Sequence, residues 1–223
     1  MTKVNSMRAK VRNECSLGMT LVEVMIAAAL LVIAFGAVYA VARAAFVNTA
    51  FHDAEIAAQE EARRALQSMV TELREARVWS LGAQTLPNDM LTFQIPEDAD
   101  GNGIPLNVSG YLESVGTVMY TRDLQDLNGD GLTTTQLVRL YQGGIGGGTA
   151  VTVLANDIMA NEDVNWSGTL DPGEDTNGSG VLERGIWFDR TGSLLRITVD
   201  TQKTAGQGAR VWASTIADVH ARN

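Results

Sequence analysis

The chain has 223 residues and a formal net charge of −9. That acidic balance argues against non-specific nucleic-acid binding, which requires a positive surface. Its only cysteine is Cys15, close to the N-terminus, so no intramolecular disulfide can brace the fold.

The first 18 residues form a polar, basic leader. It contains one acidic residue, Glu14, and four basic residues, Lys3, Arg8, Lys10 and Arg12. This excess of positive charge predicts a cytoplasmic N-terminus. We treat residues 1–18 as a segment separate from the folded chain.

An apolar segment follows the leader, and the 19 residues from Val24 to Ala42 carry no formal charge. A helix of that length, at about 1.5 Å per residue, nearly crosses a hydrocarbon core of about 30 Å. We therefore predict a transmembrane helix over residues 19–45. Glu23 is the exception at its start, because a carboxylate in a membrane segment is costly and marks a functional position.

Gly18, Met19 and Glu23 together resemble the processing signature of type IV prepilins and pseudopilins. The resemblance implies that prepilin peptidase cuts after Gly18 and that the new N-terminus, Met19, is N-methylated. It also implies that Glu23 pairs with the N-terminal amine of a neighbouring subunit. The expected product is a structural subunit of a type IV pilus or a type II secretion pseudopilus, without catalytic activity.

The same resemblance implies a single-pass inner-membrane protein whose partners are other pilin or pseudopilin subunits, with its soluble domain in the periplasm or on a surface filament. A secretory signal peptide is the alternative interpretation. Its cleavage site would follow the apolar region, where the small residues Ala42, Ala44 and Ala45 stand. A lipoprotein is excluded because Cys15 precedes the apolar segment.

Helical patterning continues beyond the membrane segment, over residues 46–80. No proline occurs before Pro87, so one helix can run from Met19 to about Trp79. Apolar residues spaced by three and four predict an amphipathic helix with one buried stripe. The stripe comprises Ala62, Leu66, Met69, Val70, Leu73 and Ala76.

Residues 81–223 are rich in glycine, asparagine and alternating apolar positions, which predicts an antiparallel β domain. The residues Asp189–Ser193 have the composition of a hairpin connection. We expect all strands to share one sheet that packs on the helix around Leu66 and Leu73, which makes the fold class α+β and pilin-like. The predicted strands are Met90–Ile95, Thr117–Arg122, Gln136–Tyr141, Ala150–Leu154, Gly185–Asp189, Leu194–Asp200 and Arg210–Ile216.

Three short segments are similar to PilW-type minor pilins and GspJ-type pseudopilins. They are Ala62–Leu66 leading to Glu72–Arg74, then Val153–Ala155 before a variable loop, and the terminal Arg222–Asn223. The resemblance does not separate the two groups.

Four loops place oxygen-bearing side chains at alternate positions, followed by glycine. They begin at Asp98, Asp126, Asp163 and Asp175. Such spacing lets several side chains turn towards one hard cation, and Ca²⁺ binds six to eight oxygens in this way. Aspartate, asparagine and glycine are also ordinary turn formers. For the first loop both interpretations stand, and for the other three we favour metal.

The third and fourth loops together resemble the tandem calcium loops of dockerin-like and thrombospondin-type-3-like repeats. A bound Ca²⁺ would offset carboxylate repulsion and order an insertion that spans Asn161 to Glu183. The expected ligands in these two loops are Asp163, Asn165, Ser167, Asp171, Glu174, Asp175, Asn177, Ser179 and Glu183, and in the second loop Asp126, Asn128 and Asp130.

The sequence contains no recognisable motif of catalytic residues. There is no Gly-x-Ser-x-Gly or His-Glu-x-x-His motif, and His52 and His220 are far apart. The glycine-rich stretch 143–148 lacks the spacing of a dinucleotide fingerprint. We therefore expect no enzyme, and the alternative function is a calcium-dependent adhesin or binding module on a pilin-type anchor.

Overall fold

The computed structural model describes residues 19–76, 89–111, 113–143, 147–164, 167, 169–176, 178 and 180–220. The leader, Gly18 and Trp79 lie outside the described residues, as do Asn165, Asn177, Ser179 and the terminal Arg222–Asn223. The chain divides into two compact units, Met1–Val47 and Asn48–Asn223, and each is described by itself.

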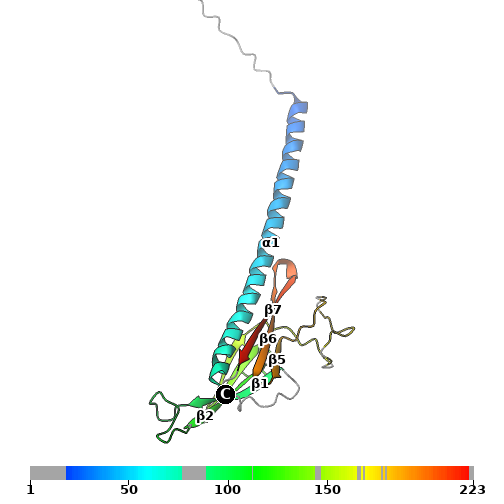
Figure 1. Cartoon of the computed structure of the whole chain (residues 1–223). Coiled ribbons are helices and arrows are strands. Elements are labelled where there is room, and N and C mark those ends of the chain that lie inside the picture. Colours follow the sequence, from blue (N-terminus) through cyan, green and yellow to red (C-terminus); the bar gives the residue numbers. More distant parts are fainter. Residues whose placement is uncertain are drawn as a thin grey trace, which may run out of the picture. The chain divides into compact units, whose positions relative to one another are not determined.

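The helix α1 spans Leu21–Glu75 without interruption, as predicted (Figure 1). Its start is defined by Thr20 and Glu23, which cap each other. The Glu23 amide donates to Thr20 Oγ1 at 3.3 Å, and the Thr20 amide donates to Glu23 Oε2 at 2.8 Å. This reciprocal arrangement is a capping box, which satisfies two amides that the helix itself leaves unbonded.

All seven predicted strands are present, and every neighbouring pair is antiparallel. The first sheet has the order β1-β2-β3-β4 and the second has the order β5-β6-β7. The fold class is therefore α+β, as expected. The strands are β1 Met90–Glu97, β2 Ser114–Arg122, β3 Leu137–Gln142, β4 Thr149–Ala155, β5 Ile186–Thr191, β6 Leu194–Thr204 and β7 Arg210–His220.

The expectation of a single sheet was wrong, because the strands form two sheets. The reason lies in the chain that follows β4. Ile158 forms an isolated bridge with Thr201 of β6, and the Met159 amide donates to the Asp200 carbonyl at 2.9 Å. This segment occupies the side of β6 that extends beyond the shorter β5, so the chain leaving β4 attaches to the second sheet instead of adding a strand to the first.

Both sheets pack against the second half of α1. The predicted stripe is buried at Ala62, Leu66, Met69, Leu73 and Ala76, while Val70 is partly buried. Each large apolar side chain removed from water contributes about 1.5–3 kcal/mol. Their neighbours in the same core come from both sheets and include Leu91, Phe93, Val118, Tyr120, Ile186, Phe188, Ile197 and Val199.

Glu72 joins α1 to the four-stranded sheet. Its carboxylate accepts a hydrogen bond from the Tyr120 hydroxyl at 2.6 Å and another from Arg139 Nε at 2.7 Å. Burial and the adjacent Glu72 carboxylate raise the pKa of Tyr120, so its hydroxyl stays protonated and remains a donor.

Glu61 makes the corresponding link to the three-stranded sheet. It pairs with Lys203 of β6 and accepts the backbone amide of Asn156. Burial alone would raise the pKa of Glu61, but the Asn156 amide and Lys203 outweigh it and lower the pKa below the ordinary value of 4.5. The charged form of Glu61 is thus the one that the fold prefers.

We predict that Glu61→Gln lowers the free energy of unfolding by about 1.5–3 kcal/mol at neutral pH, the usual range for a hydrogen bond to a charged group. Because the folded-state pKa of Glu61 is lowered, this stabilisation is present above its ordinary pKa and is lost as the pH falls through the folded-state value. Denaturant unfolding of the full chain at several pH values measures it.

Glu60→Gln is the matched control, since Glu60 neighbours Glu61 but is exposed, and it should change stability by less than about 0.5 kcal/mol. An effect of Glu61→Gln that is equally large at neutral and acidic pH would contradict the assignment.

Candidate functional site

The first half of α1 presents apolar side chains on all sides. Leu30, Phe35, Val41 and Phe46 are each more than 60% exposed. This helix is long and apolar enough to cross a membrane by length and composition. It is therefore compatible with a single membrane span, and a signal sequence near the N-terminus would satisfy the same criterion.

Glu23 lies in the first turn of this helix, four residues after Met19. Its Oε2 atom accepts from the Thr20 amide at 2.8 Å and from the Thr20 hydroxyl at 3.1 Å. The carboxylate is thereby held towards the end of the helix where Met19 lies. Our sequence analysis missed the role of Thr20, although Thr-x-x-Glu before an apolar run is the signal of a capping box.

The first acidic loop, between β1 and β2, gathers three carboxylates. Ligand atoms of Asp98, Asp100 and Glu113 all lie within 4.8 Å of one another. The amide of Gly103 donates to Asp98 Oδ2 at 2.5 Å, and this bond is the main reason that the pKa of Asp98 is lowered. Glu113 was not predicted as a ligand from the sequence, because it lies outside the run of alternating residues.

The second loop, between β2 and β3, is closed by side-chain amides. Gln136 Nε2 donates to Asp130 Oδ2 at 2.7 Å, and Asn128 Nδ2 donates to the same oxygen at 2.9 Å. The pKa of Asp130 is lowered, chiefly by Gln136. The structure thus brings Asn128 and Asp130 together, whereas Asp126 accepts the Gly131 amide at 3.1 Å. Gln136 is a buried participant that sequence spacing did not reveal.

The insertion that contains the third and fourth loops is fastened at its base by buried acids. Asp163, predicted as a calcium ligand, is buried and accepts hydrogen bonds from Arg184 Nη2 at 2.7 Å and Arg184 Nε at 3.1 Å. The Arg184 guanidinium also stacks on Trp187 at 4.0 Å. The Glu162 carboxylate accepts the Thr176 amide at 3.0 Å, which ties the fourth loop to the start of the insertion.

Other predicted ligands of the insertion are placed around Glu174. Its carboxylate accepts the amides of Val164 at 3.1 Å and Asp171 at 3.0 Å, which folds the third loop back onto its start. The hydroxyl of Ser167 contacts Thr169. Glu183 is buried where the insertion returns to β5, and its carbonyl accepts the Glu162 amide at 2.9 Å.

Three of the four loops share one internal hydrogen bond. The first aspartate accepts the amide of the glycine five residues later, in the pairs Asp98–Gly103, Asp126–Gly131 and Asp175–Gly180. This bond closes a sharp turn at the sixth position, where a loop-type calcium site also has a glycine. The same bond also stabilises a turn without a cation.

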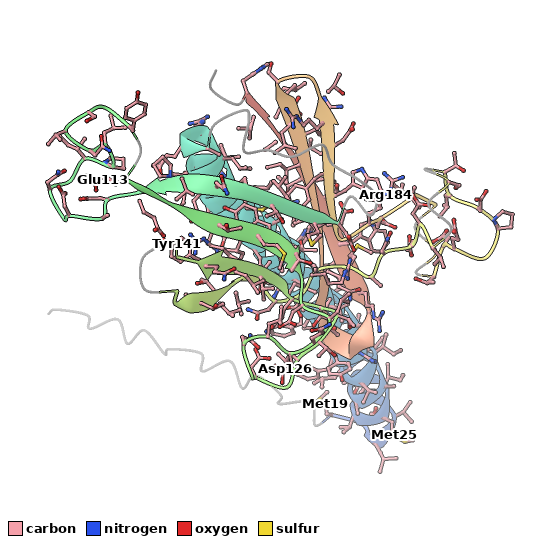
Figure 2. The ribbon with its side chains drawn as sticks, turned by 90° about the horizontal axis from the view of Figure 1, so that it is seen from below. Met19, Met25, Glu113, Asp126, Tyr141 and Arg184 are labelled. Carbon is pink, nitrogen blue, oxygen red and sulfur yellow. The ribbon has the colours of Figure 1, made fainter. Side chains whose placement is uncertain are left out.

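The acidic loops occupy different places on the soluble unit, as the labels Glu113, Asp126 and Arg184 show (Figure 2). Only the third and fourth are adjacent, because they belong to one insertion. Those predicted ligands that the structure describes are therefore not joined into a single centre. Comparison with known proteins finds no family model, curated protein or solved structure that matches this chain.

Proposed function

We propose that the chain is a structural subunit, a minor pilin or pseudopilin, of a type IV pilus or a type II secretion system. The observation that carries this proposal is Glu23 in the first turn of an exposed apolar helix, five residues after Gly18. Cleavage after Gly18 would create an ammonium group on Met19. An ammonium and a carboxylate in apolar surroundings each gain by pairing with the other.

In this proposal the capping box orients Glu23 for assembly. Both hydrogen bonds from Thr20 reach Oε2, which leaves Oε1 for the ammonium group of a neighbouring subunit. One charge pair would then set the register between subunits, and the apolar side chains of residues 19–45 would pack in the filament core. The sheet domain would be displayed in the periplasm or on the surface.

The alternative, a calcium-dependent adhesin or binding module on the same anchor, is favoured by one feature. The loop between β1 and β2 presents Ile104, Val108 and Tyr111, with Val108 and Tyr111 at least 70% exposed. Asn107 Oδ1 accepts the amides of Ser109 and Tyr111, at 2.9 and 3.1 Å, so the apolar tip is an ordered turn. Exposed apolar side chains held in this way suit contact with a partner.

We also propose that Ca²⁺ braces the acidic loops of the soluble domain. The turn-closing bonds of Asp126 and Asp175 and the convergence of Asp98, Asp100 and Glu113 support this role. Carboxylate and carbonyl oxygens are the ligands that Ca²⁺ prefers. A cation would also relieve repulsion between acids in a domain that has no disulfide.

Mass spectrometry of the sheared surface-filament and membrane fractions of the native host tests the main proposal. We expect a peptide that begins at N-methylated Met19. Its presence in filaments would identify a pilus subunit, and its confinement to the envelope would identify a secretion pseudopilus or an assembly-initiating subunit. An intact leader, or an N-terminus near Ala45, would refute the prepilin assignment.

Substitutions at the capping box separate charge pairing from helix capping. Glu23→Gln preserves the capping geometry, since glutamine suits the same position, but removes the charge. We expect processed Glu23→Gln protein to be absent from assemblies. Thr20→Ala should be incorporated at close to the normal level, because it keeps the backbone amide bond that orients Glu23. Immunoblots of the filament and envelope fractions measure both variants. Normal incorporation of Glu23→Gln would refute the charge pair.

For the calcium proposal, the full chain in detergent should gain thermal stability when Ca²⁺ is added, by about 2.7 kcal/mol at a hundredfold excess over Kd. Asp175→Ala should reduce this gain. Asp163→Ala should lower stability even without calcium, because it leaves Arg184 without its buried partner. Asp189→Ala removes one exposed charge outside the loops and serves as the control. A full calcium response in Asp175→Ala would show that the fourth loop is a simple turn that binds no calcium.

A further inference from the structure

Strand β7 forms an open edge of the three-stranded sheet. It pairs with β6 in continuous register from Arg210 to His220 and, among the described residues, with no other strand. The strand contains no proline, and its register shows no bulge. Natural proteins usually protect such an edge, because its unpaired amides and carbonyls can accept another chain.

The hydrogen bonds of β6 identify which backbone groups of β7 point outward. The Asp200 amide donates to the Gly185 carbonyl at 2.7 Å, and the Gln202 amide donates to the Asp157 carbonyl at 2.8 Å. The even-numbered residues of β6 thus bond away from β7. Because antiparallel ladders alternate, odd-numbered residues of β6 bond to β7, and their partners there are also odd-numbered, such as Ala213 opposite Thr201.

The even-numbered residues of β7 therefore direct their backbone groups to the open edge. At the centre of the strand these are Trp212, Ser214 and Ile216. Their side chains lie on the outer face, where Trp212 is 44% and Ile216 is 60% exposed. An added strand would find unpaired backbone groups and two apolar contacts in one row.

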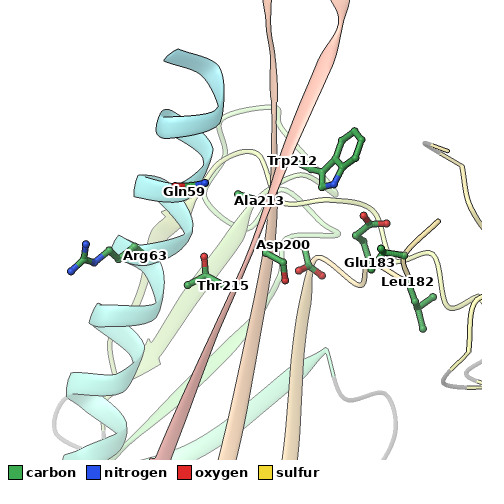
Figure 3. A pocket seen from close by; sticks show the side chains of 10 residues that line it. Gln59, Arg63, Leu182, Glu183, Asp200, Trp212, Ala213 and Thr215 are labelled. Atoms are coloured by element: carbon green, nitrogen blue, oxygen red, sulfur yellow. The ribbon is translucent and has the colours of Figure 1, made fainter. Parts of the chain in front are cut away.

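A groove of about 650 Å³ lies along this edge. Figure 3 shows Gln59 and Arg63 of α1 on one side of β7, and Leu182 and Glu183 from the end of the insertion on the other. All of these residues belong to the unit Asn48–Asn223. The groove is thus formed by elements that are packed together.

The two walls of the groove carry opposite charges. The insertion side contains the buried carboxylates of Glu183 and Asp200, and the helix side contains Arg63. Burial raises the pKa of Asp200, and the Arg184 amide, which donates to it at 3.0 Å, and the Ser214 hydroxyl partly offset this effect. A strand lying in the groove would place successive side chains towards opposite walls, because β side chains alternate.

We propose that the β7 edge accepts an extended segment of another protein as an additional strand, with a lysine or arginine directed to Glu183 and Asp200 and an adjacent acid directed to Arg63. The basic residue would pair with Ser214 of β7, and Ser214 pairs with Asp200 of β6. The backbone of the added strand would then lie two strand spacings, about 10 Å, from that of Asp200. A long basic side chain can span this distance. Valine-like residues two positions on either side would cover Trp212 and Ile216. Main-chain bonds would supply affinity and the alternating charges specificity.

A second copy of this chain fits the groove less well, because pairing of two β7 edges would place two acidic walls next to each other. The proposal does not depend on assembly through the apolar helix. A soluble peptide can therefore test it on the full chain in detergent, whatever filament the chain serves.

The probe is a fluorescent nine-residue peptide, capped at both ends, with valine at its third and seventh positions, lysine at the fifth, glutamate at the sixth and threonine elsewhere. Anisotropy should show saturable binding to the full chain. Exchange of the lysine and glutamate should weaken binding about tenfold. Two further peptides carry N-methyl groups on either the odd or the even positions, and only one of these two should lose binding, because alternate amides face β7.

Ser214→Pro tests the edge on the protein side. The Ser214 amide faces outward, so proline removes an edge donor without removing a backbone bond to β6. The hydroxyl bond to Asp200 is lost in Ser214→Pro and in Ser214→Ala alike. This variant should keep its melting temperature within a few degrees and lose peptide binding at least tenfold, whereas Ser214→Ala should still bind. Glu183→Gln should reduce the preference for lysine over glutamate at the fifth position.

Three results would overturn the proposal. The first is absence of saturable binding up to about 1 mM peptide. A Kd of about 1 mM corresponds to a binding free energy of about −4 kcal/mol. The second is loss of binding by both N-methylated peptides or by neither. The third is a dimer of the full chain, seen by analytical ultracentrifugation, that Ser214→Pro dissociates, since the occupant would then be a second copy.

Discussion

The packing of one face of α1 against two separate sheets is the constraint on which the soluble domain depends. Small residues, Ala58, Ala62 and Ala65, let the backbone of the helix approach the strands, and Leu66, Met69 and Leu73 fill the space beyond them. Neither sheet has another helix, among the described elements, on which to bury its apolar face. Folding of both sheets is therefore coupled through α1.

Two acids fix the position of the helix along this interface. Glu72 is bound by Tyr120 and Arg139 of the four-stranded sheet, and Glu61 by Lys203 of the three-stranded sheet. Apolar packing tolerates small sliding movements, whereas directional bonds to charged groups do not. One acid for each sheet gives the helix a single register against both.

One buried arginine performs a similar task for the loops. Arg122 of β2 donates to the Thr134 carbonyl at 2.7 Å and to the Arg184 carbonyl at 3.0 Å, so it joins the second acidic loop to the end of the insertion. Gly185 permits this contact. A β-carbon at that position would lie 2.3 Å from Arg122 Nη2 and 2.1 Å from the Met159 carbonyl oxygen. The domain thus links its loops by polar contacts in the absence of a disulfide.

The helix and strands follow from local sequence patterns. Period-3.6 and period-2 patterns are local properties of the chain, so the helix and all seven strands could be predicted, with the buried stripe of the helix. The division into two sheets could not, because the attachment of residues 157–159 to β6 is a contact between parts of the chain that are distant in sequence. The partners of Asp163 and Glu61, and the approach of Glu113 to Asp98, likewise depend on tertiary contacts. Composition identified the acidic loops, but only the fold decided which carboxylates face an arginine, an amide or one another.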